Sequence, residues 1–96
     1  MKTVVLDGNT LTSIKEVHEL FARELGFPAY YGRTLDALND CLTDCAEPVQ
    51  VVLRAEARMA DALGGRGRAL LRLLAHAEQE FPQISVVHED APDGVE

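Results

Sequence analysis

Three aspartates stand four residues apart in the segment 30–45, at Asp36, Asp40 and Asp44. If the segment is helical, this spacing places all three along one face, because each residue turns the helix by about 100°. Like charges at this spacing oppose helix formation by roughly 0.2–0.5 kcal/mol per pair. The carboxylates could therefore serve as an acid–base pair, bind a cationic partner or form a solvated acidic face.

The helix that would carry these aspartates is predicted from residue 35 to about residue 45. Thr34 precedes it and can accept a hydrogen bond from a free amide of the first turn. Asp36 gains from the helix dipole in that turn, whereas Asp44 loses by it near the other end. The opposite face is apolar and can dock against a core. It consists of Leu35, Leu38, Cys41, Leu42 and Cys45.

The sequence offers little support for catalysis. Asp36 and Asp40 would need an enclosing pocket that separates their pKa values, and an exposed helix face gives no sign of one. Cys45 has no local signature of a catalytic thiol. The glycine-rich stretch 64–68 lacks the ending of a phosphate-binding loop, and no ligand set has the usual zinc spacing. We therefore expect neither an enzyme nor a bound metal or cofactor.

Composition indicates one small domain whose partner is cationic. The chain has 96 residues, 47% of them hydrophobic, which is enough to fill a single core. Its net charge of −7 argues against direct binding of nucleic acid or an anionic membrane, because both require a basic surface. The same charge would attract a positively charged protein.

The two cysteines and the first residues of the chain indicate the cellular compartment in which we expect the protein. Cys41 and Cys45 lie on one predicted helix, with Cys41 expected in the core and Cys45 partly exposed, and they fit structural thiols better than a metal site. No apolar run approaches the ~20 residues of a membrane span, and the first residues become polar too soon for a signal peptide. We expect a cytoplasmic protein with reduced thiols.

The remaining segments predict a small α/β domain. A capping box of Ser13 and Glu16 opens the first helix, and Gly26 ends it. Strands are predicted over residues 3–6, 49–53 and 84–87. Helices are predicted over residues 14–25, 35–45, 55–63 and 68–81, with a flexible joint at 64–67 and a frayed acidic tail from residue 88. Apolar strands separated by helices favour a parallel sheet.

Two further features have more than one interpretation. Residues 54–72 carry five arginines against two acids, and these arginines could bind an anion, pair with the acidic regions or solvate two helices. His18 lies beside the apolar stripe of the first helix, where a packing or surface role is favoured over that of a ligand.

The run YYGRTLDALNDCLTD resembles the central segment of the barstar family, intracellular protein inhibitors of barnase-type ribonucleases. SIKEVHELFARELGFPAYYG matches the family's first helix and loop, and the similarity covers about 90 of the 96 residues. The resemblance implies an α/β domain with a three-stranded parallel sheet packed on one side by about four helices. It also implies a non-enzymatic, immunity-like inhibitor, monomeric when free, that forms a 1:1 complex with a ribonuclease.

The resemblance also assigns roles to residues of the helix and its preceding loop. An inhibitor of this family blocks a cationic active site by placing carboxylates where RNA phosphates would lie. Asp40 takes the position of the principal anchor, and Asp36 that of a second contacting acid. Tyr30 matches the tyrosine that packs on a catalytic histidine, and Gly32 and Thr34 lie in the contacting loop.

The chain departs from the family pattern at several contact positions. Asn39 stands where barstar itself has an interface tryptophan, and Asp44 and Cys45 replace a Gly-Trp pair. His76 occupies the place of a peripheral glutamate, and Arg33 replaces a loop acid. These changes put the identity of the partner in doubt more than the docking mode.

The predicted domain covers residues 1–90, followed by a disordered acidic tail at 91–96. The predicted contact surface consists of Tyr30, Gly32, Thr34, Asp36, Asn39, Asp40, Thr43, Asp44, Cys45 and His76. Two other functions stay open: an interaction or regulatory module that binds a basic non-nuclease protein, and a small enzyme that uses Cys45 or the aspartates.

Overall fold

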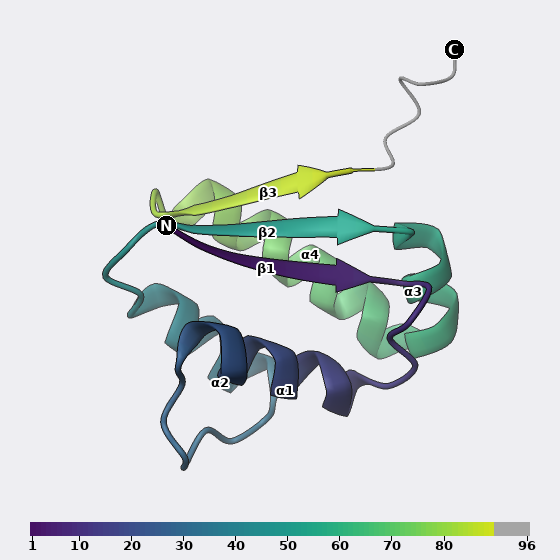
Figure 1. The fold of residues 1–96 in the computed structure, drawn as a ribbon, viewed down its shortest axis with the longest axis horizontal. Helices are drawn as coiled ribbons and strands as arrows, with labels where there is room; N and C mark the ends of the chain where they lie inside the picture. The colour runs from purple at the N-terminus through teal and green to yellow at the C-terminus, as the bar shows by residue number, and fades with distance from the viewer. Residues whose placement is uncertain (90–96) are drawn as a thin grey trace.

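The computed structural model of the protein describes residues 1–89, which form three parallel strands and four helices (Figure 1). In chain order the elements are β1 (Lys2–Asp7), α1 (Ile14–Leu25), α2 (Leu35–Thr43), β2 (Val49–Arg54), α3 (Glu56–Leu63), α4 (Gly65–Glu80) and β3 (Ile84–His88). The strands form one sheet in the order β1-β2-β3. The predicted α/β class and three-stranded parallel sheet are confirmed.

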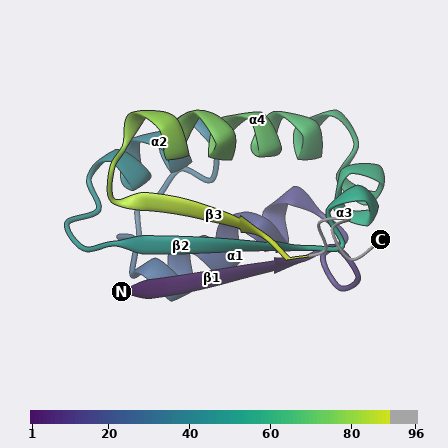
Figure 2. The ribbon, with the colours of Figure 1, turned by 90° about the horizontal axis from the view of Figure 1, so that it is seen from above.

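The helices cover one face of the sheet and leave the other open. Val4 and Leu6 of β1 are fully buried, whereas Val5 between them is 37% exposed. Val5 is in register with Val52, and Val52 with Val87, so three valines form a row on the open face. Figure 2 shows α4 running along one side of the sheet. One-sided packing explains why burial alternates even between neighbouring apolar residues of a strand.

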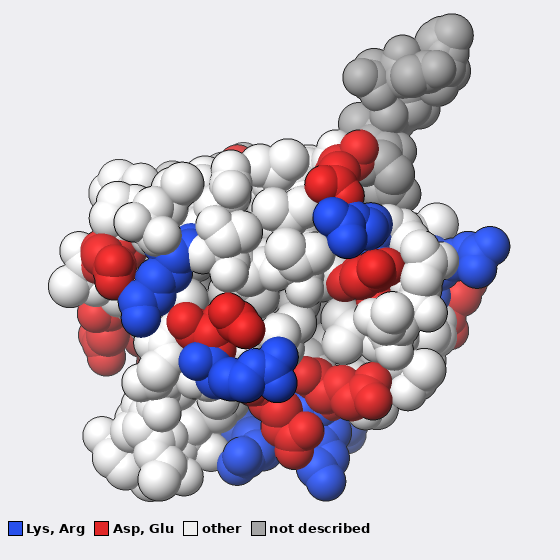
Figure 3. All heavy atoms as spheres, in the orientation of Figure 1, with Lys and Arg blue, Asp and Glu red and all other residues white. Residues whose placement is uncertain are grey.

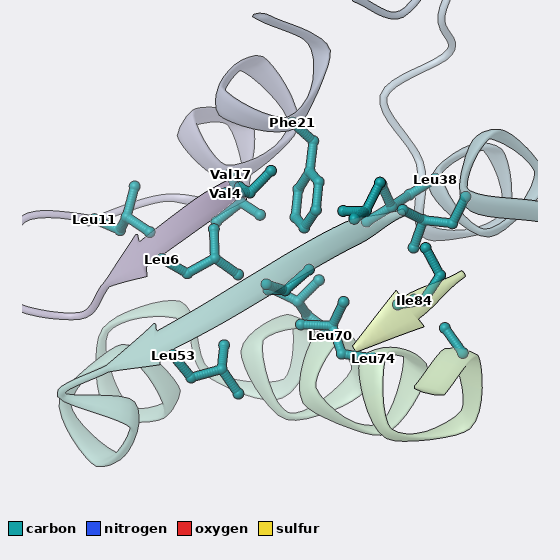
Figure 4. Packing of buried hydrophobic residues seen from close by; sticks show 14 of the residues in the cluster. Val4, Leu6, Leu11, Val17, Phe21, Leu38, Leu53, Leu70, Leu74 and Ile84 are labelled. Carbon is teal, nitrogen blue, oxygen red and sulfur yellow. The ribbon is translucent and has the colours of Figure 1, made fainter. Parts of the chain in front are cut away.

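The core lies between this sheet and the helices (Figure 4). Phe21 of α1, Leu38 and Leu42 of α2, and Leu70 and Leu74 of α4 have no exposed surface. Burying each such side chain contributes roughly 1.5–3 kcal/mol relative to leaving it exposed. The apolar face predicted for the acidic helix therefore does dock, and it fixes α2 against the body of the domain.

Helix α1 begins as predicted at Ser13, whose hydroxyl accepts a hydrogen bond from the Glu16 amide at 3.3 Å. The other hydrogen bond of the predicted capping box, which the Glu16 side chain accepts, has a different donor from the one expected. The Glu16 carboxylate accepts from the amide of Thr12 at 2.7 Å and from its hydroxyl at 3.2 Å. Gly26 ends the helix in the left-handed region at φ 68°, where glycine is favoured.

The prediction of a flexible joint at residues 64–67 is wrong. Helix α4 begins at Gly65, so most of this stretch belongs to its first turn. Gly67 is buried at the point where α3 and α4 meet, and a Cβ added there would lie 2.7 Å from the Cβ of Leu63. The glycine allows close helix packing, a role that a run of glycines in sequence does not reveal.

His88 and Glu89, which the sequence assigns to a frayed acidic tail, form part of the fold. His88 closes β3 and its Nδ1 lies 2.8 Å from a carboxylate oxygen of Glu56. Glu89 forms an ion pair with Arg54, which also lies 3.9 Å from Asp7. Figure 3, seen with the sheet in front of α4, shows basic and acidic side chains bordering an uncharged area. The predicted tail at 91–96 lies outside the described residues.

Candidate functional site

The acidic helix α2 is held at both ends by specific hydrogen bonds. The Thr34 hydroxyl accepts from the Ala37 amide at 3.1 Å, as predicted for the N-cap. The helix ends at Thr43, two residues earlier than predicted. At that end, the Gln83 side chain donates to the carbonyls of Leu42 at 3.1 Å and Thr43 at 3.3 Å. These contacts satisfy carbonyls that a longer helix would have used internally.

A groove of about 710 Å³ separates α2 from the loop that follows α1. Asp40 lines it from the helix, Asp44 lines it from the position that caps the helix end, and Tyr30 lines it from the loop. Tyr30 is 88% exposed, so its ring is free to contact a partner. Glu47 adds a third acid, and Lys2 is the one basic residue of the lining. The groove therefore combines an exposed aromatic ring with net negative charge.

The loop that presents Tyr30 is anchored by its neighbour. Figure 1 shows this loop projecting from α1 and α2 away from the sheet. Tyr31 is 6% exposed, and its ring lies 5.0 Å from that of Phe27. The Tyr31 hydroxyl and Nδ1 of the buried His18 share a hydrogen bond of 2.6 Å. His18 is thus a packing histidine, one of the two roles predicted for it, and it ties α1 to the loop.

Burial sets the protonation of this pair. Burial raises the pKa of Tyr31 to about 12, so the phenol keeps its proton. Burial also lowers the pKa of His18, and the nearby charges of Arg33 and Arg66 lower it further. At neutral pH the pair is therefore uncharged.

The two cysteines line the same groove but are not suited to nucleophilic chemistry. Burial, with a smaller effect of Asp44, raises the pKa of both the Cys41 and Cys45 thiols. The protonated thiol is the weak form of a cysteine nucleophile. Cys41 is only partly buried, so the prediction that it belongs to the core is wrong; the groove reaches it from the loop side.

The other predicted contact residues divide among several places. Gly32 lies in the groove, whereas Asp36 lines a second pocket of about 320 Å³ together with Thr34. The Thr43 hydroxyl donates to the carbonyl of Asn39 at 2.9 Å, on the outer side of the last turn. His76 is exposed on α4, edge-on to Phe81 at 6.4 Å, and it lines neither the groove nor the second pocket.

Among residues 1–89, no cluster of three or more His, Cys, Asp or Glu side chains is arranged to hold a metal ion. Within the same part of the chain, no helix is both long and apolar enough to span a membrane.

The sequence of the whole domain matches that of a known family. The model of a family described as "Barstar (barnase inhibitor)" matches residues 1–91. The chain belongs to the barstar family. It is also similar to "Putative ribonuclease inhibitor YrdF" of Bacillus subtilis (strain 168), with 35% identity over 82 residues, 84% of this chain and 90% of that protein. The family description is that of an inhibitor, not of an enzyme.

The structure of this barstar-family protein adds groove residues that sequence reasoning missed. Phe27, Lys2 and Glu47 line the groove, and none of them is among the predicted contact residues. Lys2 reaches the site because β1 pairs with β2, which places Lys2 opposite Val49. No spacing within the sequence indicates that pairing. Glu47 could have been predicted as a further acid of the site, because it follows Asp44 by three residues.

The buried His18 predicts how the stability of this barstar-family domain depends on pH. Its folded-state pKa lies below the usual value of 6.5, so the unfolded chain binds a proton first as pH falls. We therefore expect the free energy of unfolding to decrease as pH falls below about 6.5, until the folded state also binds the proton. His18→Gln keeps a hydrogen-bonding group beside Tyr31 but removes this titration.

The measurement is urea unfolding of both proteins between about pH 5 and about pH 8. The difference between their free energies should change with pH, because all other titrating groups are shared. His76→Gln, at an exposed position on α4, is the control for replacing a histidine by glutamine as such. An identical slope in His18→Gln and wild type would contradict the buried neutral imidazole.

Proposed function

We propose that this protein inhibits a barnase-type ribonuclease by occluding its active site with the groove formed by α2 and the preceding loop. The observation that carries the proposal is the convergence of exposed Tyr30 with Asp40 and Asp44 on one surface. The inhibitor acts in the cytoplasm, is monomeric when free and forms a 1:1 complex without contacting nucleic acid.

The chemistry of ribonucleases explains the charge of this surface. An enzyme that holds RNA must bind phosphates, so its active site is cationic. Carboxylates fixed on a docked helix can take the places of those phosphates and make charge-assisted hydrogen bonds with arginine or histidine. Within residues 1–89 the Asp40 side chain makes no hydrogen bond or ion pair, so it is free to engage a partner.

Rigidity and long-range charge both favour such a complex. The core contacts of Leu38 and Leu42 hold α2 in place, so little order is lost when its outer side docks. The net charge of −7 would steer the inhibitor toward a cationic enzyme and raise the association rate at low salt.

The direct test is titration of the purified chain into barnase-type ribonucleases while RNA cleavage is followed. We expect activity to fall linearly to zero at a 1:1 ratio for at least one enzyme. The absence of inhibition of every enzyme tested, at micromolar inhibitor, would refute the proposal.

One observation favours a second function. Asn39, Cys45 and His76 replace an interface tryptophan, a second tryptophan and a contacting acid in the family pattern, and His76 does not line the groove. A barstar fold with these changes could serve as a regulatory module for a basic protein that is not a nuclease. Recovery of such a protein from the native cell in a complex sensitive to Asp40→Ala would favour this alternative.

A further inference from the structure

The second pocket, of about 320 Å³, lies at the start of α2 and has a basic character that the groove lacks. Arg33 reaches it from the loop, and Arg66 reaches it from the first turn of α4. The buried His18 forms part of its wall. Two arginines distant in sequence are thus brought to one small concave site beside the proposed docking groove.

Both guanidinium groups are available for a ligand. Among residues 1–89 the ion pairs of arginines involve Arg23 and Arg54, and neither Arg33 nor Arg66 forms one. Asp36 lines the same pocket but makes no ion pair within 4.0 Å in the described part of the chain. With His18 neutral, the pocket carries two positive charges against one negative charge.

The backbone at Arg33 supports a role for its side chain. Its φ of 53° lies in the left-handed region, where a residue with a Cβ is strained and glycine is not. Gly32 immediately precedes it, so the chain places an arginine where the turn itself would favour a second glycine. Strain of this kind persists where the surrounding structure, or a function of the side chain, compensates for it.

The two sites have opposite net charge and are neighbours along α2. The groove carries Asp40, Asp44 and Glu47 against Lys2, whereas the pocket carries Arg33 and Arg66 against Asp36. Between them lies Tyr31, which lines the groove and bonds to His18 of the pocket wall. The docking surface is therefore negative along most of α2 and positive at its start.

We infer that the Arg33–Arg66 pocket binds a carboxylate side chain of the partner ribonuclease, at the rim of that enzyme's cationic active site. This inference rests on the proposed function and deepens it by stating which enzymes fit. A planar guanidinium can bind a carboxylate with two parallel hydrogen bonds, which adds geometric selectivity to charge. An enzyme with a lysine or arginine at the same rim position is disfavoured by like charge.

A carboxylate fits the pocket better than an RNA phosphate does. A single acid neutralises the excess charge of the pocket without adding other negative groups. An RNA strand would bring a phosphate at every nucleotide past Asp36, Asp40 and Asp44, against a chain of net charge −7.

The test uses the full chain and barnase variants that carry one added Asp or Lys at exposed positions around the active site. We expect at least one position where the added Asp strengthens binding and the added Lys weakens it, by about five-fold each. In the double variant Arg33→Glu/Arg66→Glu, the sign of both effects at that position should reverse. Inhibition constants and thermal midpoints are measured for each variant.

The matched control is the double variant Arg68→Glu/Arg72→Glu, which makes the same change in net charge on α4 outside the pocket. It should shift all affinities together and keep the wild-type signs at every position. If the pocket variant does the same, its arginines act only through net charge and the inference is overturned.

If the wild-type chain inhibits none of these enzymes, the proposed function fails and the pocket is tested directly. A blocked Gly-Glu-Gly peptide, which carries a single carboxylate, is then titrated while the amide shifts of residues 34–36 and the ring shifts of His18 are recorded by NMR. Saturable shifts that the Arg33→Glu/Arg66→Glu variant lacks would support a carboxylate site. Absence of shifts, or shifts with inorganic phosphate or an RNA oligonucleotide but not with this peptide, would overturn the inference.

Discussion

Replacing Asp40 by alanine is expected to weaken inhibition of a barnase-type ribonuclease at least ten-fold and to leave the thermal midpoint unchanged or raised. The affinity loss follows because a cationic side chain of the enzyme would remain buried without its charged partner. Truncating one member of such a pair typically costs about 2–5 kcal/mol. A ten-fold loss corresponds to about 1.4 kcal/mol and is set below this range, because barnase–barstar itself supplies the largest of these values.

The Asp40→Ala substitution should not lower the stability of the fold, because the Asp40 side chain does not stabilise the free chain. Its side chain is exposed and makes no hydrogen bond or ion pair among residues 1–89. Alanine is the better helix former, by up to about 0.7 kcal/mol, and removes repulsion from Asp36 and Asp44 one turn away on each side. Inhibition assays and thermal melts together separate the two effects.

Asp61→Ala is the matched control, because it removes the same charge from an exposed position on α3, away from the groove. It should change inhibition by no more than a small factor that salt abolishes. An equal loss of inhibition in the two variants would reduce the role of Asp40 to net charge. A marked loss of stability in Asp40→Ala would instead make it a structural residue.

Replacing Gly8 by alanine is expected to destabilise the fold by about 3 kcal/mol, at the upper end of the usual cost of overpacking. A Cβ at Gly8 would lie 2.1 Å from the carbonyl oxygen of Ala55 and 2.6 Å from the amide nitrogen of Met59. Both are backbone atoms at the start of α3, so no side-chain rotation can relieve the clash. The loop after β1 must move away from α3 or α3 must shift.

Gly65→Ala provides the control for this prediction. A Cβ there would meet only the guanidinium of Arg68, at 4.0 Å, and the residue lies within the first turn of α4. Alanine should be neutral or slightly stabilising at such a position. Urea unfolding of both variants measures the difference. A Gly8→Ala protein within about 0.5 kcal/mol of wild type would mean that the loop and α3 are less closely packed than described.

Local chemistry in the sequence was sufficient to predict the helices and strands and to point to the family. Ser13 and Gly26 bound α1 because a hydroxyl cap and a left-handed glycine act within one turn of the chain. Thr34 opens α2 for the same reason, and the helical period of Leu38 and Leu42 indicated which side would be buried. The long run around Asp40 pointed to the family, which the comparison with known sequences confirmed.

Features that depend on contacts between distant segments could not be predicted in this way. The sequence Asp7-Gly8-Asn9 is typical of a turn, but the close approach of Gly8 to Ala55 exists only because β1 and β2 lie side by side. In the same way, the sequence predicts that Gly67 belongs to a flexible joint, whereas the structure places it where α3 packs closely against α4.

The acidic stripe shows the same division at the site itself. A helical repeat would place Asp36, Asp40 and Asp44 on one face; α2 carries the first two, and Asp44 is the residue that caps its end. Whether they face one environment or two depends on the loop and on α4, which come from other parts of the chain. Asp36 lies with Arg33 and Arg66, whereas Asp40 and Asp44 lie with Tyr30. The spacing along the helix determines the direction in which each carboxylate points. Which residues lie near that carboxylate depends on the segments that pack around the helix.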